Sequence, residues 1–301
     1  MQYRAATIAD LKAPLFSAYH EALRDGAERF ELLLAPGVFE GRDIALHELP
    51  QGSATSVVVR GEGPEPTILR NARLTMSAHD LTVQDLQIEG YSGDVEVVTL
   101  RARRSLRVSR VRFSDLSVSG EEAAGIPPVA LSTLHGAQGA VFSLEDCWFS
   151  GNTVAASPGV LVQVDALTSR PLDELRLTRV SFVGNRAVAL LHGGAIQRVT
   201  FAGVAAAEPE VEALWWSAHA PGTVALRDSA LAFGGAGGWL KRTAYPPVPA
   251  ERFALPEVEG SAILDPATLA PGALAALAAA AASSPQASPA LAASISALAG
   301  E

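Results

Sequence analysis

An eight-residue pattern recurs six times along the chain, with its apolar positions in register. It reads apolar, any, apolar, any, charged, apolar, any, apolar. The copies are LTVQDLQI (81–88), LRVSRVRF (106–113), FSLEDCWF (142–149), LRLTRVSF (175–182), GAIQRVTF (194–201) and VALRDSAL (224–231). Alternation with a period of two is typical of β-strands, and one outward residue between two such runs indicates a bend. Repetition at intervals of about 19 to 36 residues predicts a solenoid in which each coil stacks on the previous one.

The charged position of the pattern forms a column whose sign changes between several neighbouring copies. Its members are Asp85, Arg110, Asp146, Arg179, Arg198 and Asp228. Because stacked coils lie about 4.8 Å apart, we expect opposite charges in this column to pair, and we interpret the column as a structural ladder. The last position of four copies is phenylalanine, which predicts an interior stack of Phe113, Phe149, Phe182 and Phe201.

Composition supports one elongated domain. Apolar residues make up 49% of the 301 residues, which is enough for a continuous core. The net charge of −9 argues against general nucleic-acid binding, which needs a basic surface. Cys147 is the only cysteine, so no disulfide can form within the chain, and its inward position predicts a buried core residue. The histidines lack ligand-type spacing and no phosphate-binding loop is present, so we expect no metal and no cofactor.

The first residues contain no continuous apolar segment of the kind found in Sec signal peptides. No uninterrupted apolar run reaches the length of about 18 residues needed to span a bilayer. We therefore expect a protein without a membrane span that is cytoplasmic or exported by a route other than Sec.

Residues 14–25 (PLFSAYHEALRD) are predicted to form a short helix, followed by strands within 30–41 and 56–69. This opening resembles the first coils of pectin-lyase-like right-handed parallel β-helix proteins, in which the helix plugs the end of the core. The FxGN turns at 149–152 and 182–185, with GGAI at 193–196, are similar to repeats of bacterial surface β-helix proteins. The resemblance implies an all-β solenoid, a right-handed parallel β-helix with an N-terminal capping helix.

The expected organisation has four parts. They are a helical cap (1–29), the β-helix (30–240), a Pro-rich extended linker (241–262) and an Ala-rich helical tail (263–301). Alanine is the best helix former, so we expect two short helices in the tail, near 272–283 and 290–299. Because the tail carries almost no charge, we expect it to dock on the solenoid or on a neighbouring subunit.

The resemblance also implies that the strand before each copy forms the face on which enzymes of the superfamily place their active sites. The candidate strands are 97–103, 129–134, 160–166, 188–193 and 211–216. Alternation would turn several apolar residues outward on this face: Ala130, Leu161, Ala189, Leu191 and Leu214. Such an Ala/Leu-rich face suggests contact with the tail or another subunit rather than an open carbohydrate groove.

Two sets of charged residues on this face are catalytic candidates. Arg101 and Arg103 could take the α-proton of a uronate or hold its carboxylate. These two residues belong to a cluster of six arginines, whose other members are Arg104, Arg107, Arg110 and Arg112. The alternative is that the cluster neutralises acidic residues close by. These are Asp94, Glu96, Glu121 and Glu122.

Asp165 and Glu212 could form a carboxylate pair, because glycoside hydrolysis needs about 5–9.5 Å between its two carboxyl groups and we expect roughly 9–10 Å here. The motifs of polygalacturonases and pectate lyases are absent, however. Gln163, His192 and Trp216 are the candidate ligand-binding residues of the same face.

Two functions follow from these patterns. The first is a non-catalytic β-helix that acts as a binding or assembly module, structural or adhesin-like, with carbohydrate as a candidate ligand. Its protein partner, or a second copy, would be held through the Ala/Leu-rich face and the C-terminal tail. The alternative is a polysaccharide lyase or glycoside hydrolase. We favour the first because the catalytic motifs are missing.

Overall fold

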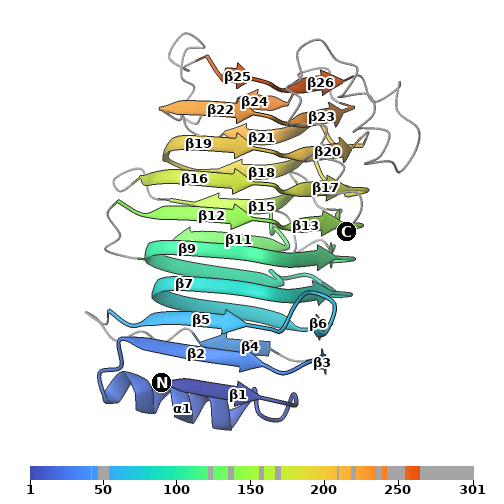
Figure 1. Cartoon of the computed structure of the whole chain (residues 1–301). Helices are drawn as coiled ribbons and strands as arrows, with labels where there is room; N and C mark the ends of the chain where they lie inside the picture. Colours follow the sequence, from blue (N-terminus) through green and yellow to red (C-terminus); the bar gives the residue numbers. More distant parts are fainter. Residues whose placement is uncertain are drawn as a thin grey trace.

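The chain folds into a right-handed parallel β-solenoid of about eight turns, as predicted (Figure 1). The computed structural model describes residues 1–41, 43–46, 54–120, 125–134, 139–155, 159–166, 171–208, 210–217, 222–234, 239–242 and 255–264. No helix in these ranges is both long enough and apolar enough to cross a membrane.

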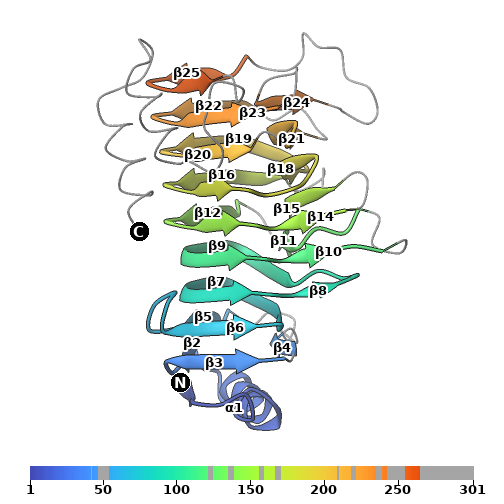
Figure 2. The ribbon, with the colours of Figure 1, turned by 90° about the vertical axis from the view of Figure 1, so that its right-hand side faces the viewer.

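The solenoid has three faces, each a stack of parallel strands, and strands β7 (Arg73–Glu89) and β9 (Val98–Ser114) run through all three. The first face also contains β4 (Asp43–Leu46), β11 (Val129–Thr133), β15 (Val160–Asp165), β18 (Ala189–Gly193), β21 (Ala213–Ser217) and β24 (Leu240–Arg242). The second contains β1 (Gln2–Ala5), β2 (Arg29–Leu34), β5 (Ser56–Arg60), β12 (Val141–Glu145), β16 (Leu172–Thr178), β19 (Ile196–Ala202), β22 (Thr223–Arg227) and β25 (Glu257–Glu259). The third contains β3 (Gly37–Glu40), β6 (Thr67–Arg70), β13 (Trp148–Ser150), β17 (Ser181–Val183), β20 (Ala205–Glu208), β23 (Ala230–Phe233) and β26 (Ala262–Leu264). A small separate sheet joins β8 (Ser92–Gly93), β10 (Ser117–Val118) and β14 (Thr153–Val154) (Figure 2).

The repeated phrase crosses from the second face to the third, and its charged residue lies at the bend. The bend residues adopt the left-handed conformation, with φ of 60° at Asp85, 52° at Arg110, 51° at Asp146 and 52° at Arg179. Arg110 donates to both oxygens of Asp85 (2.5 and 2.9 Å), and Arg179 donates to both oxygens of Asp146 (2.5 and 2.8 Å). The predicted charge ladder is confirmed for these two pairs.

The predicted register of the fifth copy is wrong. Leu175 pairs with Val199 and Phe182 pairs with Ala206, so the repeat in this coil is VTFAGVAA (199–206). Its bend residue is Gly203 (φ 66°). Arg198 lies within β19 and pairs with Glu174 at 3.6 Å instead. Glycine adopts the left-handed conformation without strain, so this bend needs no charged residue, and a period of two alone does not fix the register.

The interior phenylalanine stack has three members instead of four. The ring centroids are 4.6 Å apart for Phe113 and Phe149 and 5.0 Å apart for Phe149 and Phe182. The next residue in this column is Ala206. Phe201 is also buried, but it lies on the second face, where its ring meets Trp215 edge-on at 6.2 Å.

A buried amide ladder follows the FxGN turns. Asn152 Nδ2 donates to the carbonyl of Phe113 (3.0 Å) and to Asn185 Oδ1 (2.8 Å). Asn185 Nδ2 donates in turn to the carbonyl of Phe149 (2.9 Å) and to Glu208 Oε1 (2.6 Å). The ladder therefore ends on a buried carboxyl group. Burial raises the pKa of Glu208 to about 7, although the hydrogen bonds from Asn185 favour the ionised form.

Helix α1 (Ala13–Arg24) closes the first coil, as expected from the sequence. It buries Leu15, Tyr19 and Ala22, and the Tyr19 ring lies 5.3 Å from that of Phe30. Strand β1, which precedes the helix and pairs with β2, was not predicted. At the other end, β25 and β26 continue the second and third faces. β25 lies within the segment 241–262 that was expected to be a linker, and β26 runs from its last residue into the segment 263–301 that was expected to be a helical tail. Residues 243–254 lie outside the described residues, and so do the two tail helices expected near 272–283 and 290–299.

We expect Gly203→Val to lower the free energy of unfolding by about 1–2 kcal/mol, because a β-branched residue is strained in the left-handed conformation. A side chain at this position would also lie 3.4 Å from Arg179 Cγ. Gly203→Asp is expected to cost less, because aspartate already occupies this bend at Asp85 and Asp146. Urea denaturation of both variants measures the difference, and equal stabilities would contradict this account of the bend.

Candidate functional site

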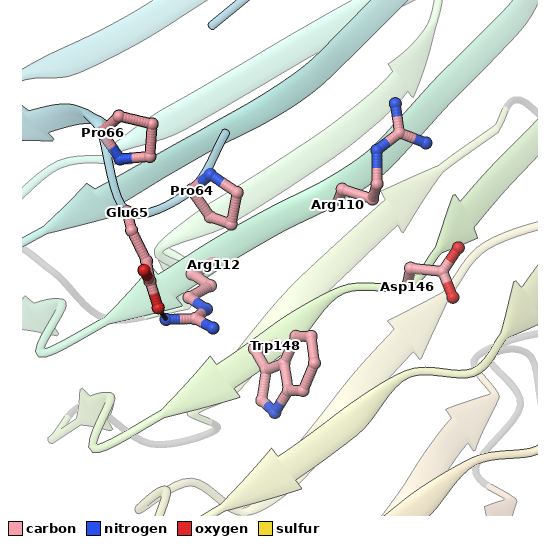
Figure 3. Close-up of a pocket in the computed structure, with 7 residues that line it drawn as sticks. All are labelled: Pro64, Glu65, Pro66, Arg110, Arg112, Asp146 and Trp148. Atoms are coloured by element: carbon pink, nitrogen blue, oxygen red, sulfur yellow. Dashed lines mark ion pairs between the residues drawn. The ribbon is translucent and has the colours of Figure 1, made fainter. Parts of the chain in front are cut away.

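An open groove of about 610 Å³ lies on the outer surface near the bend between the second and third faces. Three segments form it. The loop between β5 and β6 contributes Pro64, Glu65 and Pro66, strand β9 contributes two arginines, and the chain around the next bend contributes an aspartate and a tryptophan. Those four residues are Arg110, Arg112, Asp146 and Trp148. In Figure 3 the Arg112 side chain lies between Glu65 and the Trp148 ring.

Strand register places Arg112 and Trp148 side by side on the outside. The two residues are paired on adjacent coils, and their neighbours Phe113 and Phe149 point into the core. The Arg112 guanidinium carbon lies 5.4 Å from the centre of the Trp148 ring. A cation over an indole ring contributes about 0.5–1 kcal/mol at a partly exposed site, so the two side chains hold each other in place.

The charged groups of the groove are held with unequal strength. Arg110 and Asp146 are each fixed by the bidentate pairs described above, to Asp85 and Arg179. Burial of Asp85 opposes its ionisation, but the guanidinium of Arg110 outweighs it and lowers the pKa of that carboxyl group. Glu65 is bound more loosely, since it lies 3.6 Å from Arg112 and its side chain is 76% exposed. The groove thus combines a rigid ring and rigid charges with one loosely held carboxylate.

The three predicted ligand-binding residues form one outward column on the first face. Gln163 pairs with His192, His192 with Trp216, and Trp216 with Lys241. His192 meets the Trp216 ring edge-on at 5.2 Å, and Lys241 Nζ lies 5.0 Å from the ring centre. Lys241, which sequence reasoning missed, also pairs with Glu212 at 2.6 Å. His192 and Lys241 therefore both contact the Trp216 ring, whereas Gln163 donates its hydrogen bonds to Asp165.

The structure separates the proposed carboxylate pair. Asp165 lies two residues after Gln163, whereas Glu212 lies four residues before Trp216, so the two carboxylates are offset by six residues along the strands. At about 3.3 Å per residue this offset corresponds to about 20 Å, far beyond the distance needed for hydrolysis. The expected separation was wrong because it counted coils and not the position along each strand. Asp165 instead accepts two hydrogen bonds from Gln163 Nε2 (2.9 and 3.0 Å).

Most of the clustered arginines pair with acids on other coils of the solenoid. The pairs are Arg104 with Asp80 (2.6 Å), Arg107 with Glu145 (2.6 Å), Arg110 with Asp85 (2.5 Å) and Arg112 with Glu65 (3.6 Å). The sequence predicted acidic partners close by along the chain, but neither Asp94 nor Glu96 takes part in these four pairs. Glu121 and Glu122, the other two predicted partners, lie outside the described residues. In this cluster, the stacking of coils supplies the acidic partners, which lie 24 to 47 positions away along the chain.

The two catalytic candidates of the cluster differ in surroundings. Arg101 is exposed and lies in one column with Ser132 and Asp165. Arg103 is half-buried, and its Nε has no hydrogen-bond partner among the described residues. Arg101 and Asp165 therefore lie on the same face, two coils apart, with Ser132 on the coil between them.

The Ala/Leu-rich face lacks the exposed leucines that the sequence predicted. Leu161, Leu191 and Leu214 are fully buried and belong to the core. The N–H groups of Leu214 and Trp215 both donate to the carbonyl of Trp239 (3.0 and 3.1 Å). Because two consecutive N–H groups share one carbonyl, the strict alternation is broken near the start of β21. Leu214 and Trp215 therefore both face inward.

Ala189 is also buried, and Ala130 is half-buried. Neither can supply the exposed apolar surface that a partner would need on this face.

No group of three His, Cys, Asp or Glu side chains suited to a metal occurs in the part of the chain that the structure describes. Cys147 is buried in the core, as predicted, and burial raises the pKa of its thiol to about 12. The thiol therefore stays protonated at neutral pH and is not a nucleophile.

No known protein family matches the chain, and no curated protein or solved structure is significantly similar to it. The parallel solenoid is thus shown by the structure, and membership of the pectin-lyase-like superfamily is not shown.

Proposed function

We propose that this chain is a non-catalytic binding module that holds a carbohydrate in the groove beside Trp148. The observation that carries the proposal is the outward Trp148 ring, held by Arg112 in a groove of about 610 Å³. The C–H groups of a sugar ring pack well against an indole face, and a few fixed polar groups at its edge orient the hydroxyls. Arg110 and Asp146 are such groups, because each is held by a bidentate pair.

Two features favour binding over cleavage. The carboxylate pair considered for hydrolysis is offset by six residues. Within the groove, Asp146 is occupied by Arg179 and Glu65 lies on an exposed loop. A lyase or hydrolase remains the alternative, and release of products from any bound glycan would support it against the present proposal.

We expect Trp148→Ala to weaken binding of a glycan identified by array screening at least tenfold, because it removes the stacking surface. Trp216→Ala is the matched control, since it removes a half-buried tryptophan that also lies beside a cation but on another face. We expect that variant to bind within twofold of the unmodified chain. Isothermal titration calorimetry measures both affinities. Loss of binding in Trp216→Ala alone would move the site to the first face and contradict the proposal.

A further inference from the structure

One outward column on the third face changes its character along the solenoid. On β9 and β13 it carries the large residues Arg112 and Trp148. From β17 onward its members are small and uncharged: Ser181, Ala205, Ala230 and Ala262. The upper third face is therefore flat, and it lacks the long side chains that would keep another segment at a distance.

The small residues of this column are buried although they point away from the core. Ser181, Ala205 and Ala230 are 0% exposed, whereas their neighbours Phe182, Ala206 and Leu231 form the interior. An alanine on an uncovered outer sheet face keeps part of its surface in water. The Ser181 hydroxyl is also buried, with no hydrogen-bond partner among the described residues. Both observations indicate that another segment covers this face.

The chain that follows β26 has the right composition and starting point to be that cover. β26 is the last described strand of the third face, so residues 265–301 start at the edge of the small-residue column. Residues 266–300 contain no charged side chain and are mainly alanine and leucine. The four strands that carry the column span about 14 Å, a length that about ten helical residues can cover.

We propose that residues 265–301 fold back and dock as a helical segment on the face formed by Ser181, Ala205, Ala230 and Ala262. Small residues let a helix approach the sheet closely, and leucines of the segment lose their exposure to water on docking. This intrachain contact is separate from the glycan groove and does not depend on it.

Hydrogen exchange of the full chain, read on peptides from 265–301, tests the docking. In the unmodified chain we expect amides of this segment to be protected, independently of protein concentration. Ala230→Arg places a long charged side chain in the column and is expected to speed exchange in the segment at least tenfold. Ala130→Arg, at an outward half-buried position of the first face, is the matched control and should leave the protection unchanged. Ala262→Arg repeats the test in the last described strand, where a packing defect disturbs the fewest coils.

Three results would overturn the proposal. The first is exchange of the segment at unprotected rates in the unmodified chain. The second is protection that persists in both Ala230→Arg and Ala262→Arg while their solenoid peptides remain protected. The third is protection that rises with concentration together with dimer formation in sedimentation, which would make a second copy the occupant.

Discussion

Phe149→Ala is expected to lower the free energy of unfolding by about 3–5 kcal/mol. Phe149 is the middle ring of the interior stack, with ring centroids at 4.6 Å on one side and 5.0 Å on the other. Its removal opens a cavity between two fixed coils, because the strand spacing prevents the neighbouring rings from moving together. The hydrogen-bonded ladder beside it adds to this rigidity, since Asn185 donates to the Phe149 carbonyl.

Urea denaturation followed by circular dichroism measures the loss. Phe16→Ala is the matched control, because Phe16 is 46% exposed on the capping helix and the same substitution there should change stability by less than about 1 kcal/mol. Phe149→Leu should lie between the two, because leucine fills part of the cavity. A loss in Phe149→Ala as small as that in Phe16→Ala would show that the stacked rings do not support the core.

The fold could be predicted because its main signals are local. Period-two alternation, one bend residue per phrase and a repeat spacing of tens of residues together specify a solenoid. The prediction failed in the fifth copy, where Gly203 replaces the charged residue at the bend and the alternating pattern fits equally well at another register. The prediction also failed in part for Phe201. Its side chain points inward as predicted, but it lies on the second face and not in the phenylalanine stack of the third face.

The site was harder to predict because it depends on geometry between coils. Arg112 and Trp148 occupy the seventh position of consecutive copies, so their contact could have been inferred from the repeat alone. Glu65 could not, because it comes from a loop that no periodic pattern places over the groove. The Asp165–Glu212 hypothesis failed for a related reason, since an offset along the strand direction is invisible when only coils are counted.

We also expect the stability of the fold to depend strongly on pH, because the carboxyl group of Glu208 is buried. Burial raises its pKa in the folded chain to about 7, from the 4.5 of an exposed glutamate. Between these two values the folded state holds a proton that the unfolded state releases, so stability falls as the pH rises. The contribution of Glu208 is complete below about pH 4.5 and is lost through about pH 7, a total of about 3 kcal/mol.

Denaturation between pH 4 and 8 measures this loss. Glu208→Gln cannot ionise, so it should remove about 3 kcal/mol of the decline over this range, whatever its stability at any single pH. Glu40→Gln, at an exposed position on β3, is the control and should retain the decline of the unmodified chain. Asn185 N–H and Nδ2 donate to the two carboxyl oxygens of Glu208, and the side-chain amide of Glu208→Gln has an oxygen for only one of these donors. The variant is therefore compared with the unmodified chain by the slope of its unfolding free energy against pH, and not by its stability at one pH. Equal slopes in the two variants would show that the ladder ends on a carboxyl group that is already ionised at low pH, and that its hydrogen bonds outweigh its burial.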